Sequence, residues 1–159
     1  MNRTAGALAQ TILLALWLGA ALFFVAVVAP AAFAVLPART LAGAIVGRVL
    51  PALFYAGAVA GLAVTLLEWR VSPRMAVTGR MVAGFVTVVS CAIAQLGIAP
   101  RIAAIRALSG GSLDSLPAGD ARRVAFARLH GLSVLWLAIA ALAALIALVL
   151  AVRAQRRES

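Results

Sequence analysis

Four long apolar stretches, separated by connections that carry arginine, constrain this chain more than any other feature. They cover approximately residues 7–35, 41–68, 79–108 and 120–152. Each is long enough for a transmembrane helix, which needs about 20 mostly apolar residues. Charged residues make up only 11% of the chain, whereas a soluble domain has about 25%. We therefore predict an all-α membrane protein in which residues 1–159 form one domain, a bundle of four transmembrane helices.

The connections predict how these helices start and stop. Ser72-Pro73 is expected to break the chain between the second and third helices. The connection over 101–128 is longer, and we expect it to extend the third helix to Leu108 and to form an interfacial helical segment on the membrane surface. Asp120 is the expected N-cap of the fourth helix.

The net charge of +10 arises from arginines that flank the apolar stretches. A basic chain can bind nucleic acid, but these arginines form no single patch and no aromatic residues alternate with them. Arginine at a membrane boundary extends its side chain toward lipid phosphates, which explains the same charge. We therefore expect membrane lipids as partners and no nucleic acid.

Localisation follows from the same pattern. The absence of Lys and the abundance of Ala are typical of a GC-rich bacterial genome, so we expect the inner membrane of a bacterial cell. The first apolar stretch is much longer than the roughly 7–15 residues of a signal peptide's apolar region, so we interpret it as a retained helix. Arginines divide equally between the two sides, but they are densest in short segments on the side of the termini. That density places both termini in the cytoplasm.

Small residues predict where the helices pack closely. Two Gly-x-x-x-Gly pairs lie on one narrow face of the second helix, because their members follow steps of three and four residues. Small residues allow helix backbones to approach each other in lipid. We expect packing within the chain, with contact between copies in a homo-oligomer as the alternative. The expected packing residues are Gly43, Gly47, Gly57 and Gly61 on the second helix, and Gly19 and Pro30 on the first.

A few polar side chains form a candidate polar or ligand site. An up-and-down bundle brings His130 and Ser133, at the start of the fourth helix, to the same boundary as Arg101. Gln95 should lie deeper and hydrogen-bond another helix, because an amide that faces lipid is costly. His130 has two interpretations: an interfacial side chain bound to water or backbone, or a ligand of haem or metal or a proton relay. We assign no metal and no cofactor.

Enzyme signatures are absent from the sequence, which contains no P-loop, no Gly-x-Ser-x-Gly, no dinucleotide fingerprint and no Cys/His metal spacing. We expect no carboxylate inside a span, which argues against ion-coupled pumping. We therefore predict that the protein is not an enzyme and acts by helix packing, lipid contact or partner binding. The alternative is a small-molecule or metal transport or resistance protein, related to copper or haem, that works as an oligomer.

The most specific motif is Phe126-Ala127-Arg128-Leu129-His130-Gly131-Leu132-Ser133. It resembles the start of the fourth helix in the transmembrane-protein-205-like family, catalogued as a domain of unknown function (number 4149). Trp17-Leu18-Gly19 and Ala99-Pro100-Arg101 resemble that family's first and third helices. The resemblance implies four transmembrane helices and an activity that is mostly uncharacterised. One animal member is linked to resistance to a platinum drug, which implies export or metal handling.

Overall fold

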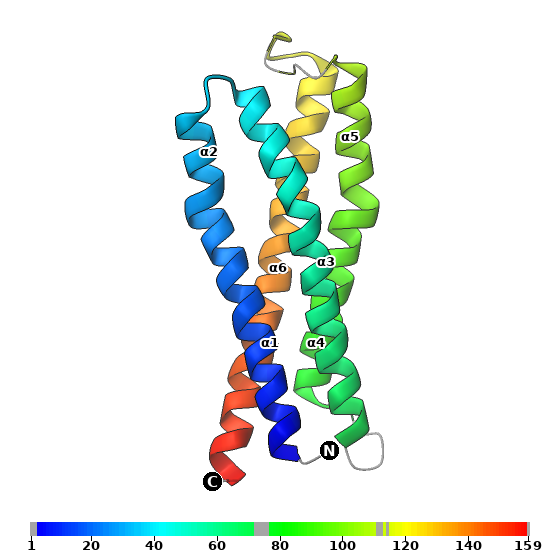
Figure 1. The fold of residues 1–159 in the computed structure, drawn as a ribbon. Coiled ribbons are helices and arrows are strands. Elements are labelled where there is room, and N and C mark those ends of the chain that lie inside the picture. The colour runs from blue at the N-terminus through cyan, green and yellow to red at the C-terminus, as the bar shows by residue number, and fades with distance from the viewer. Residues whose placement is uncertain (1–2, 72–76, 111–112, 114, 159) are drawn as a thin grey trace.

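Four long helices lie side by side in the computed structural model, which describes residues 3–71, 77–110, 113 and 115–158 (Figure 1). No strand occurs among the described residues. All four helices are long and apolar enough to cross a membrane: Ala5–Val35, Arg39–Arg70, Gly79–Leu108 and Ala121–Arg156. We call them the first to fourth spanning helices. The predicted fold class is confirmed, and the chain is by these criteria a multi-pass membrane protein.

The first and third spanning helices each contain a π-helical segment. In both, the π segment comes directly before an Ala-Pro pair, at Pro30 and Pro100. Proline lacks a backbone N–H and its ring clashes with the carbonyl four residues earlier, and a wide π turn accommodates this. Accordingly Ala29 and Ala99 donate their N–H groups five residues back. The elements are α1 (Arg3–Phe23), η1 (Phe24–Val28), α2 (Ala29–Val35), α4 (Gly79–Ala92), η3 (Ile93–Ile98) and α5 (Ala99–Leu108).

The second and fourth spanning helices, α3 (Arg39–Val71) and α6 (Ala121–Glu158), are continuous. The structure therefore starts the second helix two residues earlier than the sequence suggests and extends the fourth beyond residue 152. Asp120 caps α6 as predicted, because its Oδ1 accepts from the N–H of Arg122 at 2.8 Å. Thr78 caps α4 in the same way, accepting from the N–H of Met81 at 3.1 Å.

The connection before α6 differs in detail from the expectation. Its helical part is α5, which continues the third spanning helix, and the structure describes no separate helix between Leu108 and Ala121. Gly110 follows with a φ of 59°, the left-handed conformation that glycine favours just after a helix. The predicted break at Ser72-Pro73 lies outside the described residues.

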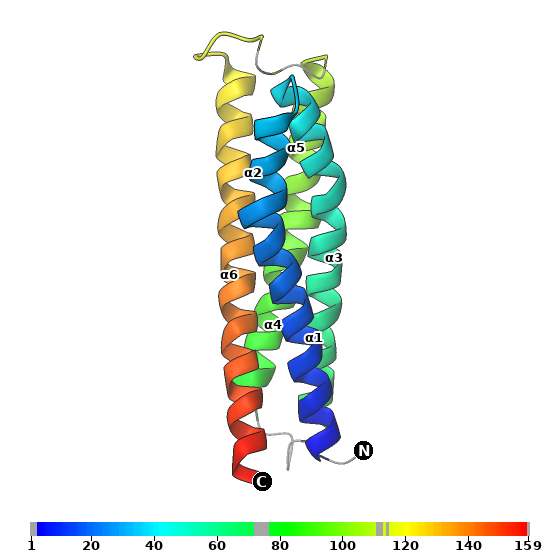
Figure 2. The ribbon, with the colours of Figure 1, turned by 60° about the vertical axis from the view of Figure 1, so that its left-hand side comes forward.

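The two ends of the bundle are named here for later use. The terminus end is where α1 begins and α6 ends, and the loop end holds residues 36–38 and, among those described, 109–110, 113 and 115–120 (Figures 1 and 2). From the terminus end to mid-bundle the helices form a closed ring in the order α1, α3, α4, α6. Toward the loop end α2 packs on α3 and not extensively on α6, and it diverges from α6 in Figure 1.

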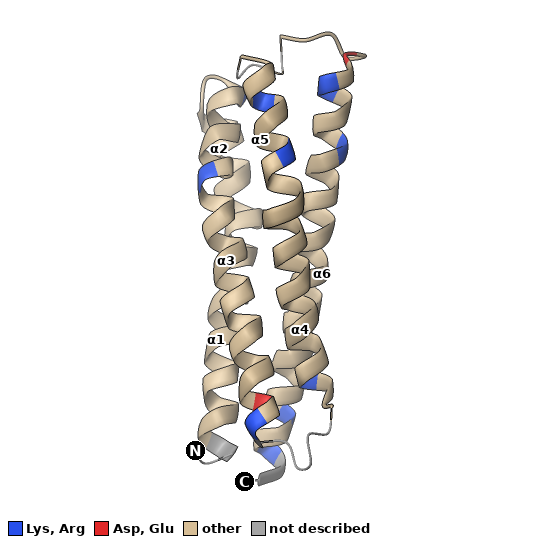
Figure 3. Cartoon of the chain, turned by 90° about the vertical axis from the view of Figure 1, so that its right-hand side faces the viewer, with Lys and Arg blue, Asp and Glu red and all other residues tan. Residues whose placement is uncertain are grey.

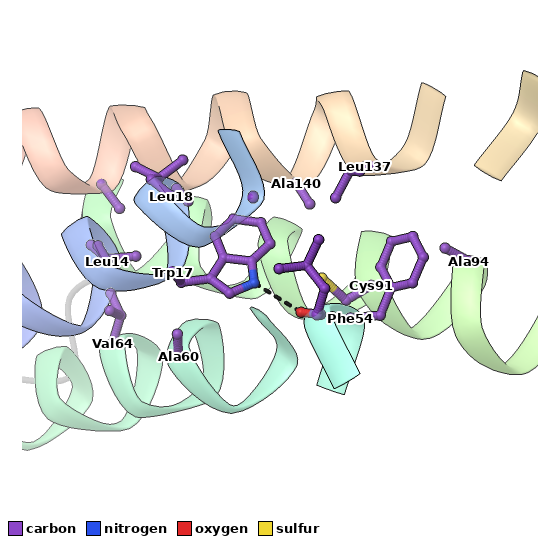
Figure 4. Packing of buried hydrophobic residues seen from close by; sticks show 14 of the residues in the cluster. Leu14, Trp17, Leu18, Phe54, Ala60, Val64, Cys91, Ala94, Leu137 and Ala140 are labelled. Atoms are coloured by element: carbon purple, nitrogen blue, oxygen red, sulfur yellow. Dashed lines mark hydrogen bonds between the residues drawn. The ribbon is translucent and has the colours of Figure 1, made fainter. Parts of the chain in front are cut away.

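The hydrophobic core occupies the terminus half and the middle of the bundle. Trp17 lies at its centre, and its indole Nε1 donates to the carbonyl oxygen of Leu53 at 2.9 Å (Figure 4). Fully buried alanines of α6, including Ala140 and Ala144, let both α1 and α4 pack closely against α6. None of the residues described in α2 or α5 is buried. Large apolar side chains such as Leu16 and Val59 instead cover the outside, as expected for a surface in contact with lipid.

Candidate functional site

A buried polar cluster joins three spanning helices at the terminus end. Its centre is Glu68 of α3, which is only 1% exposed. Glu68 Oε1 accepts from Gln10 Nε2 at 3.0 Å and lies 3.1 Å from Arg80 Nη2. Glu68 Oε2 accepts from Thr78 Oγ1 at 3.0 Å. The carboxylate is therefore matched by one cation and two further donors, as a buried charge requires.

The burial of Glu68 corrects the expectation that no carboxylate lies inside a span. Glu68 falls within the span Arg39–Arg70 and points into the bundle. It is the last residue of the predicted second helix, which is why the sequence suggests a boundary position. One signal does point to it: Glu68 is the only acidic residue before Asp114, and it continues the glycine face of α3. A lone acid on a packing face needs a partner, and Arg80 is the nearest arginine on the next helix.

The fourth spanning helix joins this end through a separate hydrogen bond. Gln155 Nε2 of α6 donates to Thr11 Oγ1 of α1 at 3.0 Å. Thr11 in turn donates to the carbonyl of Ala7 at 2.9 Å. Gln10 Oε1 is buried and has no hydrogen-bond partner among the described residues, because its amide turns its N–H group toward Glu68. Polar contacts thus link all four spanning helices at the terminus end.

At the loop end a half-buried arginine crosses from α5 to α3. Arg106 Nη1 donates to the carbonyl oxygen of Gly43 at 3.1 Å. A Cβ atom added at Gly43 would lie 3.1 Å from Arg106 Nη2, and one added at Gly47 would lie 2.9 Å from Nη1. This glycine pair, expected to pack helices, therefore makes room for a guanidinium.

Phe126 of α6 covers the same guanidinium. Arg106 Cζ lies 5.2 Å from the centroid of the Phe126 ring, a cation–π contact. The His130 ring is nearly parallel to that of Phe126, with the centroids 6.0 Å apart. Among the described residues the ion pairs are Arg80–Glu68 and Arg122–Asp120. Arg106 therefore has aromatic and carbonyl contacts but no carboxylate within ion-pair distance in the described part of the chain.

The loop end is rich in positive charge, and Figure 3 shows charged residues gathered at the two ends of the bundle. Asp120 bonds Arg122 on the surface, and the Arg122 side chain lowers the pKa of the Asp120 carboxyl. Arg123 donates to the carbonyl of Leu116 at 2.9 Å. Asp120 is the one acidic residue described at this end. The arginines on this side are Arg39, Arg48, Arg101, Arg106, Arg122, Arg123 and Arg128.

The residues of the predicted polar site have different environments in the structure. His130 is exposed and contacts Phe126, whereas Ser133 is buried on α6. Arg101 is exposed and has no described contact with His130. Gln95 lies in η3, where its Oε1 is buried but has no hydrogen-bond partner among the described residues, so the expected bond to another helix is not formed through this atom.

The contacts described near these residues are those of Arg106 with Gly43 and Phe126, and of Phe126 with His130. The sequence does not single out Arg106, because a helical wheel drawn through the π segment before Pro100 does not give the right face of α5. The described residues contain no group of three or more His, Cys, Asp or Glu side chains that could hold a metal.

The other predicted packing residues behave in different ways. A Cβ at Gly61 would lie 2.7 Å from the carbonyl oxygen of Gly84, so the backbones of α3 and α4 touch there. A Cβ at Gly57 would lie 2.6 Å from the Trp17 indole. Gly19 and Pro30, by contrast, are exposed. Nothing lies within 4 Å of a Cβ at Gly19, because α1 packs through the face that carries Trp17.

Comparison with known protein families identifies a match. A family model described as "Domain of unknown function (DUF4149)" matches residues 12–110. No curated protein and no solved structure matches. The matched region covers Glu68, Arg106 and the glycines of α3, and it ends before α6 begins.

Proposed function

This chain belongs to the family of the domain of unknown function DUF4149, and we propose that it is a non-enzymatic membrane protein that binds the phosphate group of an anionic lipid at its loop end. The observation that carries the proposal is the Arg106 guanidinium. It is half-buried, held by Gly43 and Phe126, and has no carboxylate beside it in the described structure.

The chemistry of arginine supports a phosphate ligand. A guanidinium has five N–H donors in a planar fork that matches two phosphate oxygens. Only the bond from Nη1 to Gly43 is formed in the described structure. The contact with Phe126 places an aromatic ring against the group without neutralising its charge. An anion that supplies both the missing charge and the missing acceptors fits this arrangement.

The partners and location proposed here follow from the arginine pattern. We place the chain in a bacterial inner membrane, as a member of the transmembrane-protein-205-like group, with both termini in the cytoplasm and its partners lipids rather than nucleic acid. Exposed apolar faces leave homo-oligomer formation open. Protease cleavage near Gly110 before and after spheroplasting tests the orientation, and cleavage only from the cytoplasmic side would reverse it.

A second candidate, transport of a small molecule or ion by an oligomer, gains one specific observation. Glu68 is buried within a span and is contacted from two other spanning helices, by Gln10 and by Arg80. An ionisable residue at such a place is a common feature of ion and proton pathways. Flux through liposomes that contain the purified protein tests this candidate, with Glu68→Gln as the comparison. Equal flux in empty liposomes would remove it.

The lipid proposal is tested by native mass spectrometry of the full chain with phosphatidylglycerol and phosphatidylcholine. Wild type should retain phosphatidylglycerol preferentially, and Arg106→Gln should bind it about tenfold more weakly, because a charged hydrogen bond is lost. Arg101→Gln is the matched control, since it removes an equal charge from an exposed residue of the same helix. Equal losses in the two variants would contradict a specific site at Arg106.

A further inference from the structure

The loop half of the bundle is divided into two helix pairs. One pair is α2 with α3, and the other is α5 with α6. The helices of each pair pack on one another, whereas α2 has no extensive contact with α6 and α3 has none with α5. In the terminus half, by contrast, every helix packs on both of its neighbours in the ring. We call residues 29–50, which are α2 and the start of α3, the α2–α3 arm.

Little buried surface joins the arm to the other pair. The structure describes no buried residue in α2 or α5, and none within residues 121–132 of α6. Within residues 39–50 of α3 the buried residues are Ala42 and Gly43. Lipid tails are as apolar as these helices, so separating the pairs in a bilayer carries no hydrophobic penalty. It follows that specific contacts have to hold the pairs together.

Arg106 makes a specific contact of this kind. It belongs to α5 and lies against Phe126 of α6, so its side chain is held by one pair. Its Nη1 donates at 3.1 Å to the carbonyl oxygen of Gly43, which belongs to the α2–α3 arm. The guanidinium also lies close to Gly47, one turn further along the same face of the arm. One side chain therefore fastens the arm to the opposite pair.

Both helices of the α2–α3 arm have a proline near the base of the arm. Pro30 follows the π segment η1, and Pro51 lies inside α3. η1 and Pro51 are at a similar distance along the chain from the connection at residues 36–38. Prolines and π segments are the usual causes of a helix bend. In the opposite pair α5 contains Pro100, but α6 has no proline. The arm is therefore better suited to bending than the pair it faces.

We infer that the α2–α3 arm swings away from α5 and α6 about η1 and Pro51, and that Arg106 latches it closed through the carbonyl of Gly43. The chain then has two states that differ in the loop half and share the same terminus half. In the open state lipid covers the separated apolar faces. The latch uses Nη1 alone, so it does not depend on the phosphate proposed for the remaining donors of the guanidinium, and failure of one proposal leaves the other standing.

Distances between pairs of spin labels in the full-length protein, reconstituted in nanodiscs, test the arm. After Cys91→Ala, labels at Val35 of α2 and Leu108 of α5 span the loop half. Labels at Leu8 of α1 and Val82 of α4 span the terminus half along the corresponding diagonal, and all four positions are exposed. The loop-half distances should form two populations and the terminus-half distances one. A loop half as narrow in its distances as the terminus half, with and without the latch, would overturn the arm.

Arg106→Met tests the latch, because methionine keeps an apolar side chain but has no donor for Gly43. The ratio of long to short loop-half distances should rise at least about tenfold, the effect of losing one hydrogen bond from a charged group. Arg101→Met, at an exposed residue of the same helix, is the matched control and should leave the ratio unchanged. Equal ratios in the two variants would rule out the latch. Distances that widen equally in both halves would show that the arm does not move separately.

Pro51→Ala tests the hinge. The alanine N–H can bond the carbonyl of Gly47, four residues earlier, and so straighten α3. Added to Arg106→Met, this change should lower the ratio of long to short loop-half distances at least about threefold, because a regular helix resists bending. A ratio that Pro51→Ala leaves unchanged would contradict a hinge at this residue.

Discussion

Two Gly-x-x-x-Gly pairs on one helix have different neighbours. Gly61 meets the backbone of α4, and Gly57 meets the Trp17 indole, which is itself hydrogen-bonded. Gly43 and Gly47 meet only the end of the Arg106 side chain. The spacing of such a pair therefore predicts that something approaches the helix closely. It does not predict whether a backbone, an aromatic ring or the charged end of a side chain approaches.

This difference follows the packing of the two halves of the bundle. In the terminus half and the middle, the glycines are enclosed by buried side chains and by a closed ring of helices. In the loop half, neither α2 nor α5 has a buried residue in the described structure. A substitution in the first region has to displace backbone or core, whereas one in the second has to displace a flexible side chain. The variants below test this contrast, from the largest expected effect to the smallest.

Gly61→Ala should have the largest effect on stability. Its methyl group would lie 2.7 Å from the Gly84 carbonyl oxygen, and backbone cannot move away as a side chain can. We expect a loss of about 3 kcal/mol, at the upper end of the usual cost of overpacking, measured by thermal unfolding in detergent. Gly131→Ala is the control, because nothing lies within 4 Å of the added Cβ atom there. Equal melting temperatures for both variants would contradict the contact of α3 with α4.

Glu68→Gln should have the second largest effect. It removes the charge opposite Arg80 and turns one acceptor of the buried cluster into a donor. Because the Arg80 side chain is 20% exposed and can reach water, we expect about 2 kcal/mol, less than the loss of a partner from a fully buried pair. The double variant with Arg80→Gln should lose less than the sum of the two single variants. Strictly additive losses would mean that the pair is not coupled.

Gly47→Ala should barely change stability but should weaken lipid binding. The added methyl group meets Arg106 Nη1 at 2.9 Å, and the end of an arginine side chain can shift at little cost. We expect an unfolding temperature close to that of wild type and affinity for phosphatidylglycerol reduced roughly threefold. Gly19→Ala, at an open position of α1, should change neither. A strong loss of stability in Gly47→Ala would mean that this glycine, like Gly61, cannot accept a methyl group, and would contradict the contrast between the two pairs.

The smallest effect is expected at Asp120, which is less buried than Glu68. Its pKa is lowered in the folded state, mainly by the side-chain hydrogen bond from Arg122. The resulting stabilisation is present above the ordinary pKa of 3.8 and is lost as the pH falls through the lowered value. Asp120→Asn should therefore abolish a small acid-induced fall in melting temperature. An unchanged acid response in this variant would assign that fall to another group.

Much of the fold is predictable because each apolar stretch dictates its own helix. Asp120 is recognisable as a cap because its signal lies within a few residues of the helix that it starts. The candidate site is less accessible to sequence reasoning, because its contacts join residues far apart in the chain. Arg106 and Phe126 are unremarkable in isolation, and Arg101 is an equally plausible arginine until the packing is known. Glu68 looks like a boundary residue until Gln10 and Arg80 are seen beside it.

The π segments before Pro30 and Pro100 also change the phase of their helices. A wide turn takes in one residue more than an α turn, and one residue corresponds to about 100° of rotation. The faces of α2 and α5 are therefore turned relative to those of α1 and α4, and a helical wheel drawn through either proline assigns the wrong residues to the inside. Deleting one residue from η1 would leave an equally apolar spanning helix. It would nevertheless present a different side of α2 to α3 and to the bilayer.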